Sequence, residues 1–260
     1  MSRYKVINRG SLLVLFLSLA ILALQASAEE ANNVELVGQF GGDCRGVFVQ
    51  GNYAYIGEGN GLRIVDISNP AQPIGKGKAQ LPDIARGIYV SGGYAYVAAE
   101  EAGLRIVDVS NIASPTEVSY IDTPSIAYAV CVQGSYAYVA DFEGGLRIID
   151  ISNPASPQEA GRYFTFRFAY WVDVKGNYAY VVDFKQLLII DISNPASPRL
   201  KGIYNMPSYA EGVYVSGNYA YIANYEAGLG IIDVSNVMAP AEVGHLDTPG
   251  HAEGVYVSGS

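Results

Sequence analysis

The sequence has few of the residue types on which most active sites and disulfide-stabilised folds depend. Its 260 residues include two cysteines, two histidines and one tryptophan, Trp171. Two cysteines are too few for a disulfide framework. Cys44 and Cys131 fall in separate copies of a repeat described below, where their Cα atoms would lie more than about 7 Å apart, so we expect two free thiols. His245 and His251 lack a third ligand at zinc-like spacing, and no metal site is predicted.

Positive charge is also scarce. There are 16 lysines and arginines against 25 aspartates and glutamates, which gives a net charge of −9. An acidic surface repels phosphate backbones and anionic lipid headgroups. We therefore expect no nucleic acid partner.

Long hydrophobic runs are missing outside the N-terminus. Arg3, Lys5 and Arg9 precede an apolar run at 12–24, which is followed by small residues at 26–28. This order is typical of a secretory signal peptide. The run is shorter than the roughly 20 residues of a spanning helix, so an uncleaved anchor is the less favoured alternative. We predict cleavage after Ala28, a secreted or cell-surface protein of net charge −12, and no transmembrane span after cleavage.

An internal repeat accounts for most of the remaining chain. A Gly-x-Tyr-Ala-Tyr type of segment and an Ile-Val/Ile-Asp-Ile/Val-Ser segment each occur five times, with a period of 41 or 42 residues. The first tyrosines and the aspartates that mark the copies are Tyr53, Tyr94, Tyr136, Tyr178 and Tyr219, and Asp66, Asp108, Asp150, Asp191 and Asp233. Self-similarity at this period is typical of propeller blades.

Each copy contains four short segments with the composition of β-strands. In the first copy they begin near Gly46, Tyr53 and Gly61, with a fourth after the turn at Pro70. Gly-Asn or Gly-Ser pairs suit a tight hairpin between the first two strands, and proline ends the third. We predict an all-β fold, a β-propeller of four-stranded blades over residues 34–260 with five complete repeats.

The strand count predicts an interrupted ring. Residues 34–40 resemble a fourth strand without its partners, and residues 252–257 resemble the first strand of a sixth copy. The missing strands would leave exposed sheet edges, which all-β proteins avoid. We therefore expect a fragment of a chain with at least six blades.

The segment at 61–70, Gly-Leu-Arg-Ile-Val-Asp-Ile-Ser-Asn-Pro, and its four relatives resemble the LVIVD repeat of exported and cell-surface bacterial and archaeal propeller proteins. The fourth copy departs from the pattern, because Gln186-Leu187-Leu188 replaces Gly-Leu-Arg. The resemblance implies architecture and location, and it brings no shared catalytic activity with it.

The residues that recur in every copy are interpreted as structural. An aspartate just before Ser-Asn-Pro is placed to accept backbone N–H bonds and fix the turn. Five equivalent carboxylates on separate blades also cannot converge on one reacting atom. No catalytic residue is predicted.

Positions that change from copy to copy are better candidates for binding. Six of them directly precede the innermost strand and are expected to ring the mouth of the channel: Arg45, Arg86, Tyr128, Tyr170, Glu211 and Glu253. Asp141, Asp183 and Asn224 lie in the loops between the second and third strands, at the same end. Function often resides on loops held by a rigid scaffold. The alternative is a solvated rim without a specific ligand.

The sequence therefore favours a non-catalytic, exported interaction scaffold that binds an extracellular protein, peptide or glycan at the channel mouth, without a cofactor. The competing hypothesis is an extracellular hydrolase or lactonase-like enzyme that uses the acidic rim, with or without calcium. A third is a structural unit of a surface layer. No Gly-x-Ser-x-Gly elbow or phosphate-binding glycine loop supports catalysis.

Overall fold

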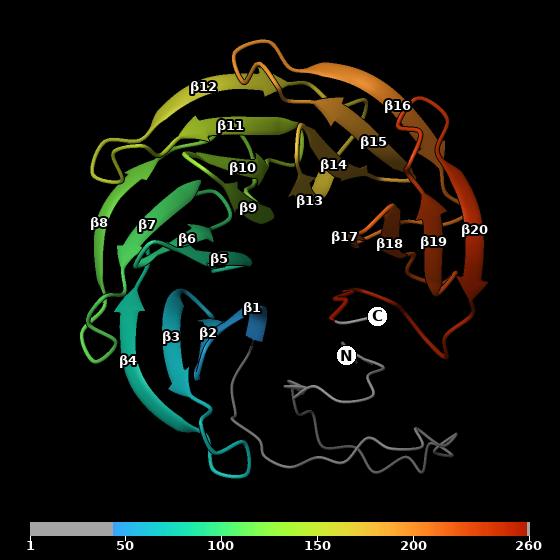
Figure 1. Ribbon diagram of the computed structural model, residues 1–260. Helices are drawn as coiled ribbons and strands as arrows, with labels where there is room; N and C mark the ends of the chain where they lie inside the picture. The colour runs from blue at the N-terminus through green and yellow to red at the C-terminus, as the bar shows by residue number, and fades with distance from the viewer. Residues whose placement is uncertain (1–43, 259–260) are drawn as a thin grey trace.

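The computed structural model describes residues 44–258, which form five four-stranded antiparallel sheets arranged around an axis (Figure 1). The predicted signal peptide and the predicted strand at 34–40 lie outside the described residues. Within 44–258 there is no helix of the length and apolarity needed to cross a membrane.

Each blade is a meander whose strands follow one another from the axis outward. Blade 1 holds β1 (Cys44–Gln50), β2 (Tyr53–Glu58), β3 (Gly61–Asp66) and β4 (Ile74–Gln80). Blade 2 holds β5 (Gly87–Ser91), β6 (Tyr94–Ala98), β7 (Leu104–Asp108) and β8 (Thr116–Ile121). Blade 3 holds β9 (Ala129–Gln133), β10 (Tyr136–Ala140), β11 (Leu146–Asp150) and β12 (Gln158–Tyr163). Blade 4 holds β13 (Ala169–Lys175), β14 (Tyr178–Asp183), β15 (Gln186–Asp191) and β16 (Arg199–Asn205). Blade 5 holds β17 (Gly212–Ser216), β18 (Tyr219–Ala223), β19 (Leu229–Asp233) and β20 (Ala241–Leu246).

The two sequence landmarks face each other across the central hairpin of every blade. Tyr53 pairs with Asp66, for example, and Tyr136 pairs with Asp150. The aspartate then accepts the backbone N–H of the serine two residues later, as from Ser68 to Asp66 at 3.0 Å. The same bond occurs in all five copies. The recurring aspartate therefore fixes the turn between the third and fourth strands, as predicted.

Blades pack face to face through small and aliphatic side chains. The innermost strands of successive blades are in contact: β1 with β5, β5 with β9, β9 with β13, and β13 with β17. A Cβ atom at Gly87 would lie 2.7 Å from the Cα of Ala129, so this close approach of β5 and β9 requires glycine. Ala95 and Ala137, in the second strands, are fully buried between sheets. The recurring small residues are thus packing features.

The first blade ends the described arc with an incompletely covered face. Val47 and Val49 of β1 are 44% and 47% exposed, whereas Ile88 and Val90, at the same positions of β5, are 7% and 3% exposed. Those two residues of β5 pack against blade 1. In Figure 1 blades 1 and 5 stand at the two ends of the arc.

The partial sixth copy follows the path of an innermost strand. Ala252 forms a bridge with Tyr225, as Ala169 does with Phe142 two blades earlier. The ring centroids of Tyr256 and Tyr214 of β17 are 4.8 Å apart. Residues 252–257 thus pack along blade 5 where the sequence predicted a sixth blade to begin.

Candidate functional site at the channel mouth

The structure brings together several residues that were predicted to ring the mouth, namely Arg86, Tyr128, Tyr170, Glu211 and Glu253. The guanidinium carbon of Arg86 lies 4.3 Å from the centroid of the Tyr128 ring. That ring meets the ring of Tyr170 edge-on at 5.3 Å. Glu211 and Glu253 interact electrostatically with each other. Arg45 is exposed at the start of β1. The mouth therefore joins charged and aromatic groups from successive blades.

Opposite charges are partly compensated across this ring. Arg86 forms an ion pair with Glu100, with Nε 2.5 Å from Oε1. Partial desolvation and the Glu253 carboxylate raise the pKa of Glu211, while Arg86 and His251 oppose the increase. The Glu211 side chain nevertheless stays accessible to solvent. A ligand at the mouth thus meets both signs of charge beside an aromatic wall.

Asp141, Asp183 and Asn224 occupy equivalent places but are buried, with exposures of 0%, 1% and 1%. Oδ2 of Asp183 accepts the backbone N–H of Phe166 at 2.9 Å, and both oxygens accept that of Arg167. Burial raises the pKa of Asp183, although these hydrogen bonds lower it. The three side chains thus lie beneath the mouth surface, where Asp183 supports the loop between β12 and β13.

The residue directly after this buried position presents its side chain from a strained backbone. Gly59 of blade 1 has a φ of 56°, in the left-handed region that glycine adopts easily. Glu100, Phe142, Phe184 and Tyr225 take the same place with φ values of 42°, 43°, 58° and 44°. A bulky residue rarely adopts such a conformation, and strain of this kind is concentrated at functional sites.

Phe142 and Phe184 belong to a continuous aromatic cluster that was not predicted from the sequence. The rings of Phe142 and Phe168 stack with centroids 4.4 Å apart and planes 9° from parallel. On one side the stack continues to Tyr128, and on the other it reaches Phe184. The cluster joins the mouth residues Tyr128 and Tyr170 and extends to Tyr209. Beyond it, His251 stacks on Tyr225 at 3.7 Å.

A signal for this cluster was present in the sequence. After the second strand the copies read Gly59, Glu100, Phe142, Phe184 and Tyr225, a position that does not repeat. Its aromatic members, Phe142, Phe184 and Tyr225, were not among the predicted site residues. Their proximity depends on the loops between successive blades, which the repeat pattern does not specify.

Deeper in the channel a second polar group joins blades 3, 4 and 5. Asp173 of β13 accepts the backbone N–H of Val215 of β17 at 2.7 Å. The thiol of Cys131 donates to its other oxygen at 3.7 Å. Burial raises the pKa values of both groups. Cys44 and Cys131 are not joined by a disulfide, as predicted. A protonated, buried Cys131 is an inert thiol.

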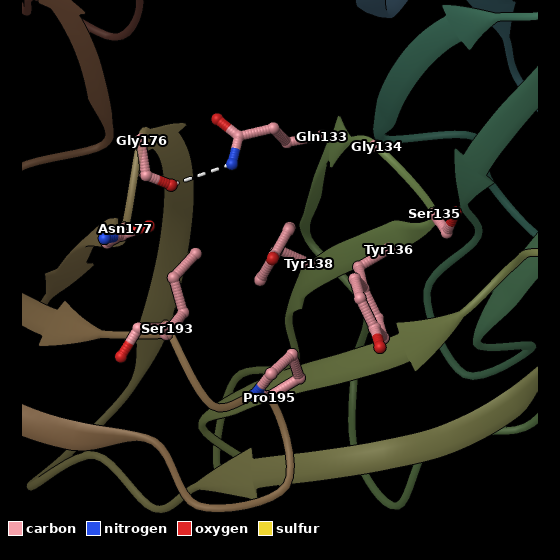
Figure 2. Close-up of a pocket in the computed structure, with 10 residues that line it drawn as sticks. Gln133, Gly134, Ser135, Tyr136, Tyr138, Gly176, Asn177, Ser193 and Pro195 are labelled. Carbon is pink, nitrogen blue, oxygen red and sulfur yellow. Dashed lines mark hydrogen bonds between the residues drawn. The ribbon is translucent and has the colours of Figure 1, made fainter.

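The opposite end of the propeller carries a shallow depression between blades 3 and 4 (Figure 2). Its volume is about 420 Å³, and its lining includes the strand residues Gln133 and Tyr138 and the turn residue Ser193. The side-chain amide of Gln133 donates to the carbonyl of Gly176 at 2.8 Å. No charged side chain is among its lining residues, and it offers less specific chemistry than the mouth.

The competing enzyme hypothesis includes calcium, which would need several oxygen ligands close together. In the described part of the chain, no three histidine, cysteine, aspartate or glutamate side chains are grouped so that they could hold a metal ion. The carboxylate oxygens of Asp183 are occupied by backbone N–H groups. Asp183 is thus engaged by the backbone of the loop between β12 and β13.

Comparison with known proteins agrees with this architecture. The family model for the LVIVD repeat matches residues 41–80, 83–123, 125–165, 167–206 and 207–248. No curated protein matches the sequence.

Three solved structures share the fold at low sequence identity. The computationally designed Ika8 protein is 10% identical with a TM-score of 0.64, and the match covers 83% of this chain and 65% of Ika8. A functionally unknown protein from Desulfotomaculum acetoxidans is 13% identical with a TM-score of 0.69, over 82% of this chain and 72% of that protein. The β-propeller domain of Myceliophteria thermophila Cps50 (Swd1) is 14% identical with a TM-score of 0.65, over 80% and 73%. At these identities the likeness shows the fold alone.

Proposed function

The chain belongs to the LVIVD-repeat family, and from that premise we propose that it is a non-catalytic, exported interaction scaffold that binds a protein, peptide or glycan at the channel mouth. The single observation that carries the proposal is the aromatic cluster at the mouth, in which Phe142 and Phe184 have positive φ. If these residues served only to pack the hairpin, glycine could stand in their place without backbone strain, as Gly59 does in blade 1.

The distribution of repeating and non-repeating residues supports the same proposal. Recurring residues such as Ala95 and Asp108 build blades and turns. The mouth residues differ from blade to blade while the backbone beneath them stays the same. A rigid frame with variable loop residues is a common basis for recognition, because the frame carries the stability and leaves the loops free to vary.

Export is supported by the N-terminal sequence pattern. Sequencing the N-terminus of protein recovered outside the cell tests this part of the proposal. A new N-terminus at Glu29 is the expected result, whereas retention of residues 1–28 on intracellular protein contradicts export.

Binding is tested with the purified protein on a glycan array and against a displayed peptide library. For any ligand found, the double variant Arg86→Ala with Tyr170→Ala should weaken binding by about tenfold or more, as central interface residues often do. The control is Met238→Ser, at a 74% exposed residue in the turn between β19 and β20 at the opposite end of the blades. Equal loss in both variants, or none in either, contradicts a site at the mouth.

The competing enzyme hypothesis uses the carboxylates of Glu211 and Glu253. Turnover of glycan, ester or lactone substrates that disappears in Glu211→Gln would replace the scaffold proposal with a catalytic one. The raised pKa of Glu211 is the observation that makes this assay worthwhile, since a general acid needs a raised pKa.

A further inference from the structure

One sector of the mouth end departs from the repeat in both charge and size. The loop between β12 and β13 reads Phe-Thr-Phe-Arg-Phe-Ala over residues 164–169. The corresponding loops read Asp-Thr-Pro-Ser-Ile-Ala over 122–127 and Asp-Thr-Pro-Gly-His-Ala over 247–252. An acidic residue, a proline and a small residue are thus replaced by Phe164, Phe166 and Arg167. The same loop backbone therefore carries different surface chemistry in this blade.

A charge reversal accompanies these changes on the neighbouring hairpin. Lys185, between β14 and β15, occupies the place of Glu101, Glu143 and Glu226 in other blades. Its ammonium nitrogen lies 4.9 Å from the centroid of the Tyr209 ring. The guanidinium carbon of Arg167 lies 5.2 Å from that of Phe184. The ring centroids of Phe184 and Tyr209 are 4.5 Å apart, so these groups form one surface.

The cations of this surface are free to meet an anionic partner. In the described part of the chain, Arg167 and Lys185 contact aromatic rings and form no ion pair. The Asp183 carboxylate, whose pKa Arg167 lowers, is buried and holds backbone N–H groups. In blade 2, by contrast, Arg105 forms an ion pair with Asp122. Phe164 takes the place of that aspartate in the next loop, and its ring lies beside Arg147.

Large apolar side chains project from the loop between β12 and β13 and from the loop between β16 and β17. Phe164 is 61% exposed, Phe166 58% and Tyr209 44%. Exposed apolar side chains grouped together mark interaction sites rather than ordinary surface. Their backbone is held in place, because Asp183 accepts N–H bonds from Phe166 and Arg167. The surface is therefore prearranged, which lowers the entropic cost of binding.

We propose that this cationic aromatic surface, made by Phe164, Phe166, Arg167, Lys185 and Tyr209, docks an acidic peptide segment that carries large apolar side chains. The apolar side chains of the peptide pack on the exposed rings, while its carboxylates pair with Arg167 and Lys185. This inference rests on the proposed function and specifies the partner class and the sector of the mouth end that it contacts. It also runs against the net charge of −9, which by itself favours basic ligands.

Fluorescence anisotropy with two labelled peptides tests the preference. One peptide alternates glutamate with leucine, and the other alternates lysine with leucine. The acidic peptide should bind more tightly than the lysine peptide. Added salt should weaken the binding of the acidic peptide, because exposed ion pairs are screened. Tighter binding of the lysine peptide, or no binding of the acidic one, overturns the proposal.

Variants that restore the residues of other blades locate the site without disturbing the fold. Phe164→Asp, Arg167→Ser and Lys185→Glu each introduce a residue found at the corresponding position of another blade, namely Asp122, Ser125 and Glu143. The triple variant should bind the acidic peptide about tenfold or more weakly than wild type, and its thermal unfolding midpoint should be unchanged. The control, Tyr120→Ser, removes a 55% exposed ring beside Arg105 in blade 2 and should leave binding unchanged. Equal binding by triple variant and wild type overturns the proposal.

Other occupants give distinct results. Cosedimentation with phosphatidylglycerol vesicles that the triple variant abolishes, without peptide binding, replaces the peptide with a membrane surface. Self-association that the triple variant abolishes replaces it with a second copy of the chain. If the acidic peptide fails while an array ligand still depends on Arg86 and Tyr170, this inference falls and the proposed function stands. If no ligand of any class binds, both fall.

Discussion

Asp183 holds the backbone N–H of Arg167 through both of its carboxylate oxygens, at 3.0 and 3.1 Å, from a position that is 1% exposed. A residue predicted to contact a ligand thus lies one layer beneath the surface. From there it fixes the loop that carries Phe164, Phe166 and Arg167.

Replacing Asp183 with alanine should destabilise the protein by about 1–3 kcal/mol, because two partly buried backbone donors lose their acceptor. Urea unfolding followed by circular dichroism measures the loss. Amide hydrogen exchange should accelerate at Phe166 and Arg167. Glu143, an exposed residue of the corresponding hairpin in blade 3, changed to glutamine, is the control and should change stability little. Unaltered exchange in the loop would contradict the supporting role of Asp183.

Phe142→Gly should be more stable than Phe142→Ala by about 1 kcal/mol. Both variants remove the ring, and only alanine retains a Cβ that the left-handed region disfavours. The φ of Phe142 is 43°. Urea unfolding midpoints of the two proteins provide the comparison. At Glu143, which has no positive φ, glycine should give no such advantage over alanine. Equal stability of the two Phe142 variants would show that no backbone strain is present.

Asp173 should stabilise the folded protein more at low pH than at neutral pH. Burial raises its pKa in the folded state, so its contribution is fully present below the unfolded pKa of about 4 and is lost as pH rises through the folded pKa. The stability advantage of wild type over Asp173→Asn should therefore shrink as pH rises from about 4 towards neutrality. Chemical unfolding at several pH values tests this. A difference that grows with pH would contradict the prediction.

The turn aspartates should stabilise the folded protein more at neutral pH than at low pH. Hydrogen bonds from Ser68 lower the pKa of Asp66 to about 2, and bonds from Ser110 lower that of Asp108. Their contribution is present above the unfolded pKa of about 4 and is lost as pH falls through the folded values. Acid titration followed by circular dichroism measures the stability of each protein relative to its own value at neutral pH. Between about pH 4 and 2, Asp66→Asn should lose less stability than wild type. Parallel curves would contradict this.

The sequence by itself determined the blade. Its period, its turn residues and its recurring aspartates specify local strands and hairpins, and the all-β propeller with five LVIVD repeats is confirmed. These features could be predicted because each depends on residues close together in the chain, such as Asp66 and Ser68. The signal peptide and the extracellular partner remain predictions.

Only the tertiary structure decided which loop residues are accessible and which are buried. Asp183 and Phe184 are neighbours in sequence, yet the first is buried beneath the loop while the second joins the aromatic cluster. The cluster itself joins rings of different blades, such as Phe142 and Phe168. Their distances depend on how one blade packs against the next, and a pattern that repeats within each blade carries no such information.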